Sequence, residues 1–108
     1  MSEQELLVDI DGGAGRLRLN RPRAIHALTA GMCTTMIAAL QAWRGDDAVS
    51  VVMIDHAEGR GFCAGGDVKE IQRLPGFEGI VSAAHATMAL TVAIDECAVP
   101  VIAAVHGY

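Results

Sequence analysis

Apolar and polar positions alternate near the start of the chain. Residues 6–10 form a short apolar run, and the sequence Asp-Gly-Gly-Ala-Gly at 11–15 is a strong turn signal. Residues 16–20 then alternate polar and apolar side chains. The two segments together predict a β-hairpin with one solvated face, and Pro22 is expected to end it because proline cannot continue a strand ladder.

The next stretch changes to helical spacing. Thr29 is the expected N-cap of a helix that continues through Trp43. Met32, Met36 and Leu40 recur at helical intervals, so this stripe is expected to form core, and the Gly-Asp-Asp sequence at 45–47 stops the helix.

The rest of the chain predicts two strands and two helices. Residues 49–54 are apolar apart from Ser50, as expected for a strand covered on both faces, and residues 100–105 predict a second buried strand. Asp67 and Glu70 predict an Asp-led capping box that opens a short helix ending before Leu-Pro-Gly at 74–76. A longer helix is expected over residues 79–97. This order indicates an α/β layer with right-handed crossovers and no domain boundary.

Composition sets the class of protein. The chain has 108 residues, enough for one modest domain, with 52% hydrophobic and 19% charged residues. This is rather apolar for its size, so part of the surface is expected to be covered by more protein. The net charge of −5 argues against nucleic acid or an anionic membrane as the main partner.

Targeting signals and cysteines point to a cytoplasmic protein. The acidic start of the chain lacks the basic region of a secretory signal. The longest apolar stretch, residues 80–94, is shorter than a membrane span and is interrupted by polar residues such as His85, so we expect a buried helix without membrane contact. The three cysteines form neither a metal-ligand pattern nor a disulfide framework, which suits a reducing compartment.

The sequence Ala64-Gly65-Gly66, just ahead of the short helix, is the strongest candidate for chemistry. Free backbone N–H groups at such a position can donate to a carbonyl oxygen that gains negative charge, which is the chemistry of an oxyanion hole. The alternative is a structural turn that allows tight packing of helix against strand. Spacing alone leaves both open.

Three longer motifs extend this pattern. The sequences LNRP at 19–22, FCAGGD at 62–67 and PVIAAVHGY at 100–108 occur in an order that resembles the crotonase superfamily, also called the enoyl-CoA hydratase/isomerase family. The resemblance runs from about residue 6 to 108. It implies the N-terminal part of a ββα-repeat spiral fold, with residues 1–108 forming a partial acyl-CoA-binding domain.

The resemblance also implies roles for individual residues. Gly66 would supply the first oxyanion N–H group. The residues implied to line the path of the coenzyme A moiety are Ala64, Gly65, Gly66, Asp67, Val68 and Lys69. Arg23, Arg60 and Lys69 are candidates for the CoA phosphates because basic side chains suit an anion. Asp67 would act as a helix cap and touch substrate only through its backbone. No metal or redox cofactor is implied, since coenzyme A is part of the substrate.

The remaining machinery of similar proteins, namely the second oxyanion N–H and the catalytic carboxylates, is expected beyond Tyr108. Because the chain ends just after a strand, we expect a complementary C-terminal segment or a homo-oligomer to complete it. Turnover is therefore expected of a longer chain rather than of these residues alone.

The sequence is least specific about which reaction the chain takes part in. The stretch from 20 to 70 looks most like 3-hydroxyisobutyryl-CoA hydrolases, whereas the end of the chain looks equally like a general hydratase. A third alternative is a non-catalytic CoA-binding or assembly fragment. His85 lies where those hydrolases carry a Glu-rich helix start, so it is either a base or, by preference, an interior side chain.

Overall fold

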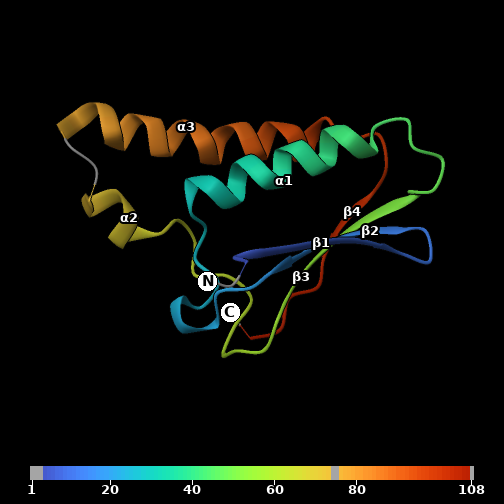
Figure 1. The fold of residues 1–108 in the computed structure, drawn as a ribbon, viewed down its shortest axis with the longest axis horizontal. Coiled ribbons are helices and arrows are strands. Elements are labelled where there is room, and N and C mark those ends of the chain that lie inside the picture. Colours follow the sequence, from blue (N-terminus) through green and yellow to red (C-terminus); the bar gives the residue numbers. More distant parts are fainter. Residues whose placement is uncertain (1–3, 74–75, 108) are drawn as a thin grey trace.

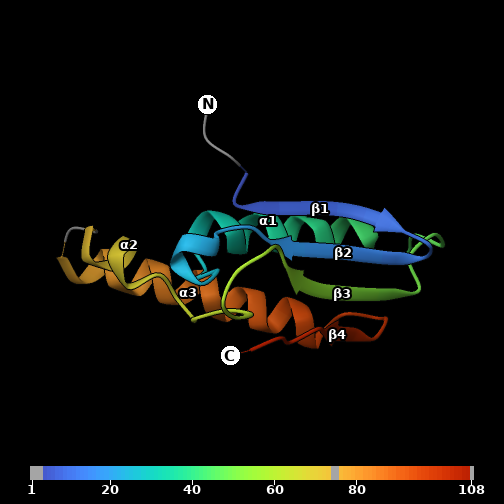
Figure 2. The same ribbon diagram turned by 90° about the horizontal axis from the view of Figure 1, so that it is seen from below.

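The structure, a computed structural model, describes residues 4–73 and 76–107. The elements in chain order are β1 (Leu6–Asp11), β2 (Ala14–Leu19), the 3₁₀ turn η1 (Pro22–Ala24), α1 (Ala30–Trp43), β3 (Val51–His56), α2 (Val68–Arg73), α3 (Gly76–Asp95) and β4 (Val101–Ala103). The strands form one sheet in the order β1-β2-β3-β4 (Figure 2). The first pair is antiparallel and the other two pairs are parallel.

The two crossovers place their helices on the same face of the sheet. Helix α1 connects β2 to its parallel neighbour β3, and α3 belongs to the connection from β3 to β4. Both helices lie above the sheet in Figure 1. The expected α/β layer is confirmed, and the C-terminal ends of the parallel strands share one edge, where the connecting loops meet.

The hairpin at the start of the chain is confirmed. Gly12 and Gly13, the two residues between β1 and β2, have φ values of 58° and 92°. Two consecutive left-handed residues make a tight turn whose twist matches that of the flanking strands, and glycine adopts them without a Cβ penalty.

Helix α1 also begins and packs as predicted. The Thr29 hydroxyl accepts a hydrogen bond from the backbone N–H of Met32 at 3.1 Å, which caps the first turn. Met32, Met36 and Leu40 are buried, and Trp43 at the end of the helix is half-buried. The predicted apolar stripe is thus the face that α1 turns toward the sheet.

The position of Trp43 explains a glycine in β2. A Cβ atom at Gly15 would lie 2.6 Å from the indole ring, closer than carbon atoms can approach. We expect Gly15→Ala to lower the free energy of unfolding by about 1–3 kcal/mol, because the half-buried Trp43 ring must shift. Urea denaturation measures the loss, with Gly31→Ala as control, since a Cβ at that exposed position in α1 meets only the Thr29 hydroxyl at 3.8 Å. A Gly15→Ala variant as stable as the wild type would contradict the prediction.

The prediction that residues 49–54 form a strand covered on both faces is wrong. Along β3, Val52 and Ile54 are buried beneath the helices, while Val51, Met53 and Asp55 are only half-buried on the opposite face. Asp55 forms an ion pair with Arg18 of β2 on that face, at 2.9 Å. A continuous apolar run shows that both faces of a strand could be buried. In the part of the chain that the structure describes, helices pack on only one face of the sheet.

The prediction of a buried long helix is also wrong. Helix α3 begins at Gly76, and Leu90 is its only buried residue. Its N-terminal half extends beyond the sheet and lies beside α2 (Figures 1 and 2), so the predicted interior position of His85 is exposed instead. By length and composition α3 would also qualify as a membrane span, a weak test that core helices pass too. Of the residues 74–76 predicted to end the short helix, 74 and 75 lie outside the described residues, and Gly76 begins α3.

Candidate functional site

The glycine loop lies at the carboxyl-end edge of the sheet, between β3 and α2. Three backbone hydrogen bonds attach it to the segment after η1: Ala64 N–H to the Ile25 carbonyl at 2.9 Å, Leu28 N–H to the Gly65 carbonyl at 2.8 Å, and Asp67 N–H to the Leu28 carbonyl at 2.9 Å. The last two bonds make a short parallel bridge that pairs Leu28 with Gly66. The loop is therefore attached at one isolated bridge to the segment that follows η1.

This bridge decides which way the Gly66 N–H points. In a parallel pair, Leu28 bonds to the residues on either side of its partner, so the partner's own N–H and carbonyl face away from it. Gly65 N–H contacts the sulfur of Cys63 at 3.4 Å, while the N–H groups of Ala64 and Asp67 donate to backbone carbonyls. Within the described residues, Gly66 alone in 64–67 has an N–H without an acceptor, and it is exposed.

The two glycines of the loop differ in what they need. Gly65 has a φ of 103°, which side-chain-bearing residues rarely adopt. A Cβ added at Gly65 or at Gly66 would meet no atom within 4 Å. The interpretation of this pair as a site of tight helix–strand packing is therefore wrong. The surface over Gly66 is open to an incoming group.

Asp67 is the helix cap that the sequence predicted. Its Oδ1 accepts the backbone N–H of Glu70 at 3.1 Å, and its Oδ2 lies 2.7 Å from the Arg21 guanidinium. Burial works to raise the pKa of this carboxyl, but the Glu70 N–H and Arg21 outweigh it, so the pKa is lower than usual. The other bond of the predicted capping box, from the Asp67 N–H to the Glu70 carboxylate, was predicted wrongly. The Glu70 carboxylate accepts the Ala30 N–H at the start of α1 instead, at 2.8 Å.

The other predicted contact residues surround the loop on the solvent side. Ala64 is exposed, as are Val68 and Lys69 in the first turn of α2. Arg23 is exposed on η1, the turn that continues into the segment paired with the loop. The structure thus gathers Ala64, Gly65, Gly66, Val68 and Lys69 on one open surface, with Asp67 buried among them, and leaves Arg23 on the neighbouring turn.

Sequence reasoning missed His26, which is fully buried beside this loop. Its Nδ1 accepts the Arg21 backbone N–H at 2.9 Å, so its Nε2–H donates to the Glu58 carbonyl at 3.1 Å. The ring lies 5.1 Å from that of His56, which in turn lies 6.2 Å from His106. The first of these bonds needs the neutral imidazole, because a protonated Nδ1 cannot accept. The only sequence signal is a histidine four residues after Pro22.

His26 should make the stability of the fold depend on pH. Burial first, and then the neighbouring His56, lower its pKa below the ordinary value, although the bond to the Glu58 carbonyl opposes them. A lowered folded-state pKa means that stability is complete above the unfolded pKa of about 6.5 and falls as the pH drops through the folded value. Each pKa unit of depression corresponds to about 1.4 kcal/mol.

Urea denaturation between pH 7.5 and 5 tests this expectation. In His26→Asn the pH-dependent loss should disappear, and asparagine tolerates the φ of 54° that this residue adopts. His85→Gln, at an exposed position of α3, is the matched control and should retain the loss. A wild-type protein with constant stability over this range would refute the role of His26.

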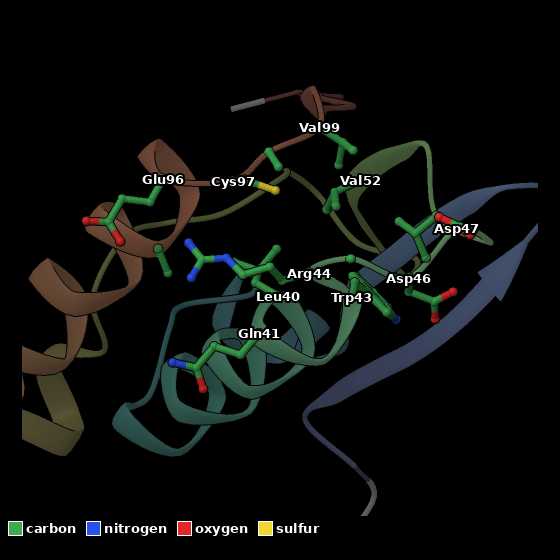
Figure 3. Close-up of a pocket in the computed structure, with 14 residues that line it drawn as sticks. Leu40, Gln41, Trp43, Arg44, Asp46, Asp47, Val52, Glu96, Cys97 and Val99 are labelled. Atoms are coloured by element: carbon green, nitrogen blue, oxygen red, sulfur yellow. The ribbon is translucent and has the colours of Figure 1, made fainter.

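A pocket lies at the opposite end of the sheet. It has a volume of about 370 Å³ and lies between the C-terminal ends of α1 and α3 and the start of β3 (Figure 3). Leu40, Trp43 and Val52 are among its apolar lining residues. The charged residues around it are Arg44, Asp46, Asp47 and Glu96. This net negative rim disfavours the phosphates of a CoA molecule, in contrast to the loop beside Lys69.

Comparison with known proteins agrees with the geometry. The family described as Enoyl-CoA hydratase/isomerase matches residues 14–108. The chain is 35% identical over 105 residues to the mitochondrial 3-hydroxyisobutyryl-CoA hydrolase of Bos taurus, covering 95% of this chain and 27% of that protein. It is 39% identical over 82 residues to a probable enoyl-CoA hydratase of Rhizobium meliloti, covering 76% of this chain and 32% of that protein. The chain thus spans about a third or less of these relatives.

The fold agrees as well. The enoyl-CoA hydratase of Mycobacterium smegmatis superimposes with a TM-score of 0.88 at 36% identity, covering 97% of this chain and 41% of the solved one. An enoyl-CoA hydratase of Rhodobacter sphaeroides gives 0.84 at 31% identity, with 96% and 32% covered. The expected fold, the N-terminal part of the spiral seen in these proteins, is confirmed.

Proposed function

The chain belongs to the enoyl-CoA hydratase/isomerase family, and from this premise we propose that it takes part in acyl-CoA thioester chemistry with the Gly66 N–H as an oxyanion donor. The observation that carries the proposal is the outward, unpaired N–H of Gly66 on a loop fixed by Leu28 and Asp67. A thioester carbonyl gains negative charge when an enolate or a tetrahedral intermediate forms. A donor already in position stabilises that charge without reorganisation.

The surroundings of Gly66 would hold the rest of the substrate. Ala64, Gly65 and Val68 present an open, largely apolar surface for the pantetheine arm, and Lys69 and Arg23 carry exposed positive charges for the phosphates. The donor that completes the oxyanion hole and the carboxylates that move protons are expected outside these residues. We propose that a complementary C-terminal segment or further copies of the chain provide them, in the cytoplasm and without a metal or redox cofactor.

The preferred reaction is the hydrolysis of a 3-hydroxyisobutyryl-CoA thioester. Similarity over 95% of this chain to the bovine hydrolase supports it, together with the sequence FCAGGDV at 62–68. Hydration of an enoyl-CoA is the second candidate, favoured by the 39% identity to the Rhizobium meliloti protein. A CoA-binding fragment without turnover is the third, since the chain spans only part of its relatives.

One experiment separates these functions. The chain is incubated with 3-hydroxyisobutyryl-CoA or crotonyl-CoA, while free thiol and enoyl absorbance are followed. Thiol release supports hydrolysis, and loss of the enoyl chromophore with the thioester intact supports hydration. Saturable binding of butyryl-CoA without turnover, stronger than that of the thioether S-butyl-CoA, supports a binding fragment that carries the Gly66 donor. Absence of any preference for the thioester would refute the proposed use of Gly66.

A further inference from the structure

Arg21 joins three separate segments of the chain next to the glycine loop. Its Nη2 lies 2.7 Å from the Asp67 carboxylate, its Nη1 donates to the Ala27 carbonyl at 2.6 Å, and its Nε lies 3.1 Å from the Glu5 carboxylate. The Arg21 side chain is 21% exposed and that of Asp67 10%, so this pair is screened by water far less than an ion pair on the open surface.

Arg21 is itself held in place from the other side. Its backbone N–H donates to the buried His26 ring, and its carbonyl accepts the N–H of His26 at 2.8 Å and of Ala24 at 3.0 Å. The guanidinium is therefore a fixed fork on a fixed turn. Two donors of that fork engage Asp67 and Ala27, the residues that flank the Leu28–Gly66 bridge on its two strands.

The consequence concerns Gly66, the residue directly before Asp67. The peptide plane that carries the Gly66 N–H also carries the Gly65 carbonyl, which accepts the Leu28 N–H. The next peptide plane ends at Asp67, whose carboxylate is held by Arg21 and by the Glu70 N–H. Without Arg21, a mostly buried carboxylate would lose its positive partner and turn toward water, carrying the adjoining backbone with it. The two bridge bonds hold this backbone on the Leu28 side, and the Arg21–Asp67 pair holds it through the side chain that follows Gly66.

We infer that Arg21 is a positioning residue that fixes the direction of the Gly66 N–H through the Asp67 carboxylate. The catalytic importance of Arg21 rests on the proposed function. Its effect on the direction of the Gly66 N–H does not, and can be measured in the protein without substrate. Arg21 needs no contact with substrate, and the pair it forms joins residues far apart in sequence, so neither residue alone signals it.

The test compares three variants in the free chain by two-dimensional ¹H–¹⁵N NMR. Arg21→Met removes the clamp, and Asp67→Asn keeps an oxygen for the helix cap but removes the charge that Arg21 binds. Arg16→Met, which breaks the more exposed ion pair with Asp9 on the open face of the sheet, is the matched control. We expect the Gly66 amide resonance to shift in the first two variants, and the hydrogen exchange of the Leu28 amide, which donates to the Gly65 carbonyl, to accelerate at least fivefold. Both should stay unchanged in the third.

Binding supplies a readout that a merely structural role would not move. Butyryl-CoA and S-butyl-CoA differ only in the thioester carbonyl, so the ratio of their affinities reports on the Gly66 donor. A wild-type preference of about twofold to tenfold, the size of one hydrogen bond, should fall to about one in Arg21→Met and Asp67→Asn while the affinity for S-butyl-CoA stays constant.

The outcomes separate the two proposals. If Arg21→Met does not fold, Asp67→Asn decides. A Gly66 resonance that stays in place in every folded variant overturns the role of Arg21, as does an unaltered affinity ratio. If the wild type itself shows no preference for the thioester, the proposed function fails, and the Gly66 resonance still decides whether Arg21 orients the loop.

Discussion

Gly66→Pro is expected to abolish the preference for a thioester over its thioether while leaving the fold intact. Proline has no backbone N–H, so the substitution removes the proposed donor itself. Because the Gly66 N–H has no acceptor within the described residues, the fold loses no hydrogen bond. Where turnover is observed, kcat should fall about 10²–10³-fold, the usual effect of losing one oxyanion donor.

Calorimetric titration with butyryl-CoA and S-butyl-CoA measures this effect. The matched control is Gly66→Ala, which retains the N–H and whose added methyl meets no protein atom within 4 Å. It should keep its stability, and any loss of affinity it shows should affect the two ligands equally. If the proline variant is folded by urea denaturation and still prefers the thioester, Gly66 is not the donor.

Local features of this fold could be predicted from the sequence because short-range rules decide them. The hairpin follows from two glycines that adopt left-handed φ values, and the start of α1 follows from the Thr29 hydroxyl. The Asp67 cap follows from the same rule. In each case the interacting groups lie within a few residues of one another.

Contacts between distant segments could not be predicted. The Arg21–Asp67 pair and the bond from the Ala30 N–H to Glu70 link the turn and helix before β3 to the loop and helix after it. Glu70 shows why this matters, since it satisfies the helix rule for a capping box yet gives its carboxylate to another helix. Which N–H group donates to the Glu70 carboxylate depends on how the crossovers bring distant segments together at one edge of the sheet.

Hydrophobic patterns also failed to specify which faces are covered. The apolar run of β3 predicts two covered faces, and the apolar helix α3 predicts burial, yet each buries one side in the described part of the chain. Apolar content measures the capacity of a segment to be covered. Whether a face is covered depends on which other helices and strands pack against it, and the sequence of one segment does not specify that.

Leu90→Ala is expected to destabilise the protein by about 2–5 kcal/mol, whereas Met88→Ala in the same helix should change stability by less than about 0.5 kcal/mol. Leu90 is 4% exposed and belongs to the core cluster, while Met88 is 61% exposed. Truncating the first leaves a cavity between α3 and its neighbours. Truncating the second removes contacts mainly with solvent.

Urea denaturation of both variants at one low protein concentration, repeated at tenfold higher concentration, measures the difference. Stability that is independent of concentration, with a large loss for Leu90 alone, matches a helix that packs on α1 along one stripe. A comparable loss for Met88→Ala that grows with concentration would mean that the exposed side of α3 is covered by another chain in solution. The one-sided packing of α3 would then describe the isolated chain only, and the apolar composition would have its explanation in assembly.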